Sequence, residues 1–277
     1  MKPKVLALAL TRTPYYVLSG GAAIVFLFPL LWAAYASVNG QAGSGQASGV
    51  GLGNYNTLLH YQDGLGQYFF NSVFVSVSTV VITLAVSLLG GYAFAKFDFP
   101  FKNAIFLVTL AILMVPYATM LIPLYVLLKV IGLQNSLLGL GLVMSMFQLP
   151  FATFMMRISF EAVPKELEEA AQVDGAGTFG VLRKILLPSV RPGIITVALF
   201  AFLAAWNDFI TPLILINDSS KAPLSLAITT LRQQTMGVID YGSLEAGVVV
   251  MALPCLLLFF ALQGQYVRGF MSGAIKG

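Results

Sequence analysis

The residues best suited to chemistry lie in one polar stretch, residues 161–192, between two long apolar runs. Its carboxylate, ammonium and guanidinium groups can form ion pairs and charge-assisted hydrogen bonds with a second protein. The spacing of its apolar residues, prolines and glycines predicts two short helices joined by a turn. The chemistry expected of this stretch is therefore noncovalent docking onto a partner.

The first of these helices is expected to begin at Pro164 and to stop at Gly175. Proline suits a first helical turn because its missing N–H would be unpaired there in any case. Residues 165–172 are nearly all good helix formers, and the helix dipole favours acidic residues such as Glu166 near the N-terminus. Gly175 can take the left-handed conformation of a C-terminal turn without steric cost.

The face that this helix presents decides what it can bind. Helical periodicity places one set of side chains on an apolar face, Val163, Leu167, Ala170 and Ala171, and another on a polar face, Lys165, Glu168, Glu169 and Gln172. Paired alanines leave room for a second surface to come close. Asp174 lies at the unfavourable end of the dipole, so a hydrogen bond across the turn is expected to hold it. Thr178 is expected to cap the second helix, residues 179–187, with Phe179 on its apolar side.

The composition identifies a membrane protein. Of 277 residues, 58% are hydrophobic and 9% are charged, far outside the range of soluble domains. Six stretches approach the roughly 20 apolar residues that cross a bilayer, at residues 15–37, 70–95, 104–128, 137–156, 193–206 and 246–266. The predicted fold is all-α, a polytopic membrane protein with six transmembrane helices in one transmembrane domain, residues 1–277.

The distribution of Lys and Arg predicts the orientation. Twelve of these residues fall on one side of the predicted spans and three, Lys129, Lys221 and Arg232, on the other, and the richer side is cytoplasmic by the positive-inside rule. Both termini and residues 161–192 are therefore expected in the cytoplasm. The net charge of +4 reflects this bias and does not indicate nucleic acid. The first apolar run is too long for a cleaved signal sequence, so an uncleaved helix is favoured.

Several kinds of site are not supported by the sequence. Cys255 is the single cysteine and His60 the single histidine, so no His-based metal site is expected. No phosphate-binding loop of the type G-x-x-x-x-G-K-[ST] occurs, and the spans carry neither the charges of ion-coupled carriers nor a catalytic nucleophile with a base. The chain is expected to be no enzyme and to bind no cofactor. Energy for transport must then arrive through the docking stretch.

One spacing within the docking stretch identifies a family. Glu169-Ala170-Ala171 is followed after three residues by Gly175, and after nine more by Ile185-x-Leu187-Pro188, which resembles the EAA loop of bacterial ABC importer permeases. Further strings, residues 54–55, 71–72, 91–97, 114–116, 122–125, 132–136, 206–213 and 263–277, resemble carbohydrate permeases of the maltose and glycerol-3-phosphate type. The resemblance covers residues 54–277, with Glu245 as a departure where an apolar residue is expected.

This resemblance implies an architecture and partners. It implies a type I ABC importer permease fold with a core permease region at residues 70–266 and a cytoplasmic EAA coupling loop at residues 161–192. The permease would lie in the bilayer of a bacterial inner membrane, paired with a second, different permease to form the heterodimer that is typical of the family. Two ATPase subunits would hold ATP and Mg, and an extracytoplasmic substrate-binding protein would deliver a sugar or sugar derivative.

Two sets of residues follow from the resemblance and the residue chemistry together. The residues expected to couple to the ATPase are Glu166, Glu169, Ala170, Ala171, Asp174 and Gly175. The residues expected to line the substrate pathway are Gln148, Trp206, Asn207 and Asp208. Gln148 suits helix–helix hydrogen bonding as well as it suits a pathway. Trp206 to Asp208 suit a membrane interface and a helix end, although a re-entrant segment that narrows the outer mouth is favoured.

Three alternatives stay open. An ABC permease for a peptide, amino acid or phosphonate shares the EAA spacing. A stand-alone channel or secondary carrier would explain the spans but leaves the loop idle. An intramembrane enzyme would need reactive groups that the spans do not contain.

Overall fold

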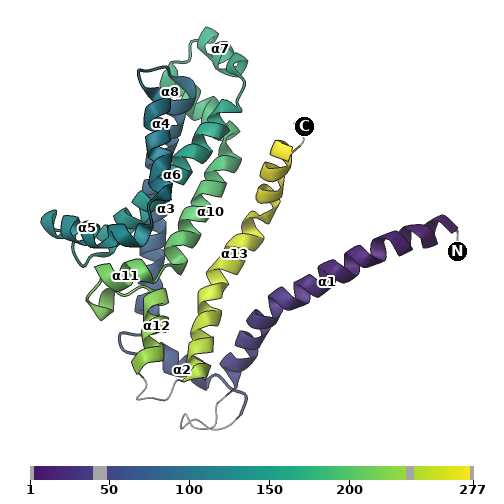
Figure 1. Cartoon of the computed structure of the whole chain (residues 1–277), viewed down its shortest axis with the longest axis vertical. Helices are drawn as coiled ribbons and strands as arrows, with labels where there is room; N and C mark the ends of the chain where they lie inside the picture. Colours follow the sequence, from purple (N-terminus) through teal and green to yellow (C-terminus); the bar gives the residue numbers. More distant parts are fainter. Residues whose placement is uncertain (1–2, 40–48, 235–239, 275–277) are drawn as a thin grey trace. The chain divides into compact units, whose positions relative to one another are not determined.

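The computed structural model describes residues 3–39, 49–234 and 240–274. These residues form helices and one isolated bridge between Asn39 and Val50. Figure 1 labels the α-helices except α9. In chain order the elements are α1 (Pro3–Val38), α2 (Gly53–Leu59), α3 (Leu65–Lys96), α4 (Lys102–Ala111), the 3-10 turn η1 (Ile112–Met114), α5 (Tyr117–Val130), α6 (Leu137–Glu161), α7 (Lys165–Val173), α8 (Thr178–Val181), the π-turn η2 (Leu182–Leu186), α9 (Leu187–Ser189), α10 (Arg191–Asn207), α11 (Ile210–Leu215), η3 (Ser219–Lys221), α12 (Leu224–Gln234) and α13 (Tyr241–Ala274).

Four helices of the described chain are long and apolar enough to cross a membrane, and up to six spans result if two bent helix pairs each count as one. The bends are 103° between residues 102–114 and 117–130, and 73° between residues 178–189 and 191–207. The third predicted span is therefore broken rather than straight. Pro116 explains this, because it cannot donate the next helical hydrogen bond and forces the residue before it out of the helical region; Val115 is extended, with φ −81° and ψ 124°.

Two compact units make up the chain, residues 1–62 with 230–253 and residues 63–229 with 254–277. In the first unit, Asn54 joins α2 to the end of α1 by donating from Nδ2 to the carbonyls of Ser37 at 2.9 Å and Asn39 at 3.1 Å. Gly242 at the start of α13 leaves the space that the Asn54 side chain occupies. Glu245 does not interrupt α13, which begins before the sixth predicted span.

The second unit is built on α3, α6 and α10, which run side by side in Figure 1. The closest approach is at Gly91 of α3, where an added Cβ would lie 2.5 Å from the Cβ of Met156 in α6. One buried cluster continues from these helices into the polar loop, since Ala171, Val181 and Leu186 pack in it with Met156 and Phe160. The loop is therefore part of the hydrophobic core rather than an appendage. The domain bounds predicted from the sequence stay predictions.

Candidate functional site

The coupling loop, residues 161–192, folds as two short helical segments around a glycine turn, as predicted. Its first helix, α7, begins directly after Pro164 and ends at Val173. Gly175 has a φ of +83°, the left-handed conformation that glycine adopts without a steric penalty. The N–H groups of Gly175 and Ala176 donate back to Gln172 and Ala171 at 3.0 and 2.9 Å, which closes the end of the helix.

The coupling residues divide between the surface and the core. Ala171 is buried at 7% exposure, whereas the other five, Glu166, Glu169, Ala170, Asp174 and Gly175, are exposed. The alanine pair thus has one member in the core and one at the surface. The prediction that a hydrogen bond holds the Asp174 carboxylate was wrong, because this carboxylate has no hydrogen-bond partner within the described chain. Only the backbone N–H of Asp174 forms a hydrogen bond, to the carbonyl of Ala170. Asp174 is exposed at this end of the helix.

The second half of the loop corrects two further predictions. Thr178 is the first helical residue rather than the cap, since Gly177 precedes the helix in an extended conformation. Phe179 is 74% exposed instead of lying on the buried side, while Val181 and Leu186 face the core. Exposed Phe179 and Val173, which is 87% exposed, are candidate contacts that the sequence prediction missed. The sequence signal that could have indicated these contacts was the presence of apolar side chains on both sides of the glycine turn.

The π-turn η2 leads into the bend before α10. Its wide turn is closed by the N–H of Leu187, which donates to the carbonyl of Leu182. Pro188 explains the irregularity, because its ring would collide with the carbonyl four residues earlier in a regular α-helix. Ser189 Oγ then donates to the carbonyl of Ile185 at 2.7 Å. The Ile-x-Leu-Pro end of the loop motif therefore forms an irregular helix end that leads into the bend before α10.

Lys96, at the end of α3, contacts the loop and was also missed from the sequence. Its Nζ lies 2.5 Å from Glu168 Oε1 in α7 and 3.0 Å from the carbonyl of Val163. The Lys96 and Glu168 side chains are only 8% and 14% exposed. The loop is therefore held by a second span as well as by the helices that enter and leave it.

The predicted pathway residues take structural positions. Trp206 is 1% exposed, stacked on Phe202 and edge-on to Phe69. The Asp208 carboxylate accepts from the backbone N–H of Ile210 at 2.9 Å and from the N–H and hydroxyl of Thr211. It therefore caps α11, as Asp does at helix N-termini. Their pathway role stays a prediction.

The remaining two pathway residues differ in what their amides bind. Asn207 is exposed, and its Nδ2 donates to the carbonyl of Leu203 at 2.8 Å. Gln148 is half-buried on α6, and its side chain makes no hydrogen bond within the described chain. The structure gives Gln148 no bond to the segment 206–208. Its amide is available to a solute or to a partner helix.

A polar network holds the segment between α11 and α12. Asn71 Nδ2 donates to the carbonyls of Ser220 and Ala222, and the N–H of Leu224 donates to Ser72 Oγ at 2.8 Å. Asn135 Oδ1 accepts from the N–H of Asn217 at 3.0 Å. Three segments of the chain are thereby tied together at this end of the unit.

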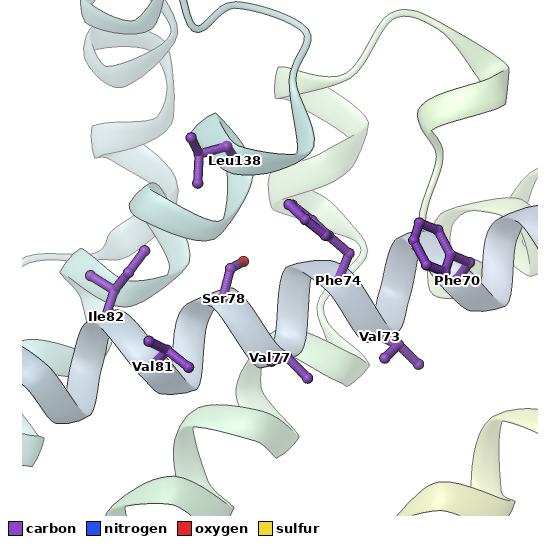
Figure 2. Close-up of a pocket in the computed structure, with 8 residues that line it drawn as sticks. All are labelled: Phe70, Val73, Phe74, Val77, Ser78, Val81, Ile82 and Leu138. Carbon is purple, nitrogen blue, oxygen red and sulfur yellow. The ribbon is translucent and has the colours of Figure 1, made fainter.

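An apolar pocket of about 480 Å³ lies on α3 and the start of α6 (Figure 2). Its lining is Phe70, Val73, Phe74, Val77, Ser78, Val81, Ile82 and Leu138. The one hydroxyl, on Ser78, donates to the carbonyl of Val75 at 2.9 Å. This pocket therefore offers no set of polar groups for a sugar. Within the described residues no group of three or more His, Cys, Asp or Glu could hold a metal ion.

Comparison with known proteins agrees with this geometry. Residues 87–270 match the family of the binding-protein-dependent transport system inner membrane component. The chain is 32% identical over 258 residues to the diacetylchitobiose uptake system permease protein NgcG of Streptomyces coelicolor, covering 91% of this chain and 85% of the relative. It is 31% identical over 258 residues to the lactose transport system permease protein LacG of Rhizobium radiobacter, covering 92% and 93%.

A solved structure has the same fold. The chain is similar to a chain of a bacterial ABC transporter involved in the import of the acidic polysaccharide alginate, with a TM-score of 0.78 and 21% identity over 95% of this chain and 98% of that one. This likeness shows that the two chains share a fold. The chain belongs to the family of binding-protein-dependent transport system inner membrane components and is a multi-pass permease subunit.

Proposed function

We propose that this permease imports a sugar or sugar derivative, and that its coupling loop docks on an ATPase subunit that supplies the energy. Relatives named for the uptake of diacetylchitobiose and lactose support the substrate class. The alginate transporter has also been solved with an alginate pentasaccharide-bound periplasmic protein. By analogy, an extracytoplasmic binding protein delivers the solute, and a second, different permease completes the pathway.

The observation that carries the docking proposal is the division of the coupling loop into an exposed and a buried side. Glu169, Ala170, Val173 and Phe179 are exposed around the Gly175 turn. Ala171, Val181 and Leu186 are buried in one cluster with α6. A partner that binds the exposed side therefore moves the buried side with it, because packed interiors transmit displacement.

In this mechanism the chain itself performs no catalysis. ATP and Mg bind the partner ATPase subunits, and ATP drives alternation only by binding one arrangement of the ATPases more tightly than the other. The coupling loops, docked on the ATPases, transmit the change between these two arrangements to the membrane spans. The excess of Lys and Arg on the loop side supports a cytoplasmic location for the loop and both termini.

Purification tests this proposal. The affinity-tagged permease is extracted from its native membrane in mild detergent, and the proteins that accompany it are identified by mass spectrometry. An ATPase and a second permease are expected. A binding protein encoded with them is then screened against diacetylchitobiose, lactose, other sugars, peptides and amino acids. Recovery of the chain alone contradicts the docking proposal, and binding of only peptides or amino acids contradicts the sugar.

Single variants assign the docking to the loop. Val173→Asp and Phe179→Asp are expected to reduce recovery of the ATPase, since each places a charge where an apolar contact is proposed. Val130→Asp is the control, because Val130 in α5 is 78% exposed but lies outside the loop. Gly175→Pro cannot adopt the positive φ. A transporter assembled with this variant should therefore hydrolyse ATP on its ATPase subunits without transport, while the variant remains in the membrane.

A further inference from the structure

We infer that Lys96 is a positioning residue that ties the docking helix α7 to span α3, so that movement of the coupling loop is imposed on α3 as well as on α6. This rests on the proposed docking of the loop, and it assigns a coupling role to a residue outside the loop. The physical basis is the set of contacts that one ammonium group makes.

The Lys96 ammonium bridges two parts of the loop. It faces Glu168 Oε1 at 2.5 Å and the carbonyl of Val163 at 3.0 Å. Val163 lies in the short link between α6 and α7, and Glu168 lies in the first turns of α7. One side chain from α3 therefore holds both the link and the helix that follows it. A hinge between α6 and α7 at this link would have to break one of these two contacts.

Burial distinguishes this ion pair from the others on the same unit. Its two side chains are 8% and 14% exposed, whereas in the pair between Lys102 and Asp98 they are 20% and 103% exposed. Exposed pairs are weakened by solvent and salt. A pair shielded from water keeps its attraction and loses much more when one partner is removed. Glu168 is also the least exposed of the acidic residues in α7.

The helix ends reinforce the contact. Lys96 is in the last turn of α3, where the dipole favours a cation, and Glu168 is in the first turn of α7, where it favours an anion. The end of α3 is itself rigid against α6, since Tyr92 contacts Phe160 with ring centroids 5.6 Å apart. A displacement of α7 is therefore transmitted to the packed pair of helices α3 and α6.

A distance measurement tests the tether. Cysteines at Leu89 of α3 and Lys165 of α7, both exposed, are introduced with Cys255→Ser and spin-labelled. The labelled permease is measured by electron–electron double resonance, alone and reassembled with its unlabelled partner subunits, with and without ATP. A single narrow distribution of distances between the two labels is expected in every state. Lys96→Met is expected to lose this narrow distribution, and to lower sugar uptake per ATP hydrolysed in the assembled transporter.

Control variants separate positioning from general stability. Lys96→Arg should keep the narrow distance, because its guanidinium can bind the Glu168 carboxylate and also donate to the Val163 carbonyl. Lys102→Met removes the exposed pair and should behave as the unaltered protein. If Lys96→Met does not fold, Glu168→Gln is measured in its place and should lose the narrow distance. A narrow distance in Lys96→Met or Glu168→Gln overturns the tether. Failure to recover any ATPase contradicts the docking proposal alone, since the distance is also measured in the free permease.

Discussion

Asn71 anchors Ala222 across the second unit: the Asn71 side-chain amide donates from Nδ2 to the Ala222 carbonyl at 2.9 Å. The same Nδ2 donates to the carbonyl of Ser220 at 2.9 Å, and Asn71 is fully buried. The Asn71 side chain therefore attaches the segment between α11 and α12 to the start of α3 at two carbonyls.

Asn71→Ala is expected to destabilise the protein by about 1–3 kcal/mol, because two backbone carbonyls lose their buried donor. The midpoint of thermal unfolding in detergent measures this. Gln67→Ala is the matched control, since exposed Gln67 bonds only to Asn71 Oδ1 on the same helix. Equal midpoints for the two variants would mean that water replaces the Asn71 donor.

Gly91→Ala is expected to destabilise the contact of α3 with α6 by about 1–3 kcal/mol, the usual cost of overpacking. The new Cβ would lie 2.5 Å from the Cβ of Met156 and 2.9 Å from the backbone N of Arg157. Gly90→Ala provides the comparison one residue away, because its Cβ would meet only Thr153, at 3.6 Å. Equal unfolding midpoints for Gly91→Ala and Gly90→Ala would contradict the close approach of α3 and α6 at Gly91.

Asp208→Ala tests whether Asp208 acts as a helix cap. Loss of the cap on α11 should cost about 0.5–2 kcal/mol, seen as a lower unfolding midpoint. Asp208→Asn should keep most of this stability, since asparagine also accepts at a helix N-terminus. Sugar uptake by Asp208→Asn then isolates the charge: normal uptake assigns Asp208 to structure, whereas lost uptake in a stable variant assigns it to the pathway.

The segment between α11 and α12 predicts a pH dependence. Hydrogen bonds from the Ser220 hydroxyl and N–H lower the pKa of Asp218 below its ordinary value of 3.8. A lowered carboxyl pKa contributes stability above the ordinary pKa, and this contribution is lost as the pH falls through the folded value. Ser220→Ala should therefore lower the unfolding midpoint at neutral pH, and the difference should disappear as the pH falls below the ordinary value of 3.8 and through the lowered pKa of Asp218. A difference that persists unchanged in acid would assign the effect to another contact of Ser220.

Local sequence signals predicted much of the fold. The all-helical class follows from long apolar runs, and the coupling loop follows from Pro164 at one end of α7 and Gly175 at the other. These signals are reliable because they act within a few residues: proline lacks an N–H, and glycine tolerates a positive φ. The break at Pro116 has the same origin, although its angle of 103° does not follow from proline alone.

The positions of the site residues depended on contacts between distant segments. Lys96 reaches Val163 across 67 residues and Asn71 reaches Ala222 across 151, and no local pattern indicates either pairing. Helical periodicity also placed Ala170 and Ala171 on one face, whereas packing against α6 and the π-turn buries only Ala171.

The sequence by itself determined that this chain is a helical membrane protein with a polar loop of two short helical segments around a glycine turn, because hydropathy, charge and turn-forming residues act locally. Only the tertiary structure decided which loop residues are exposed and which side chains hold the loop, because burial and ion pairing depend on which helices meet.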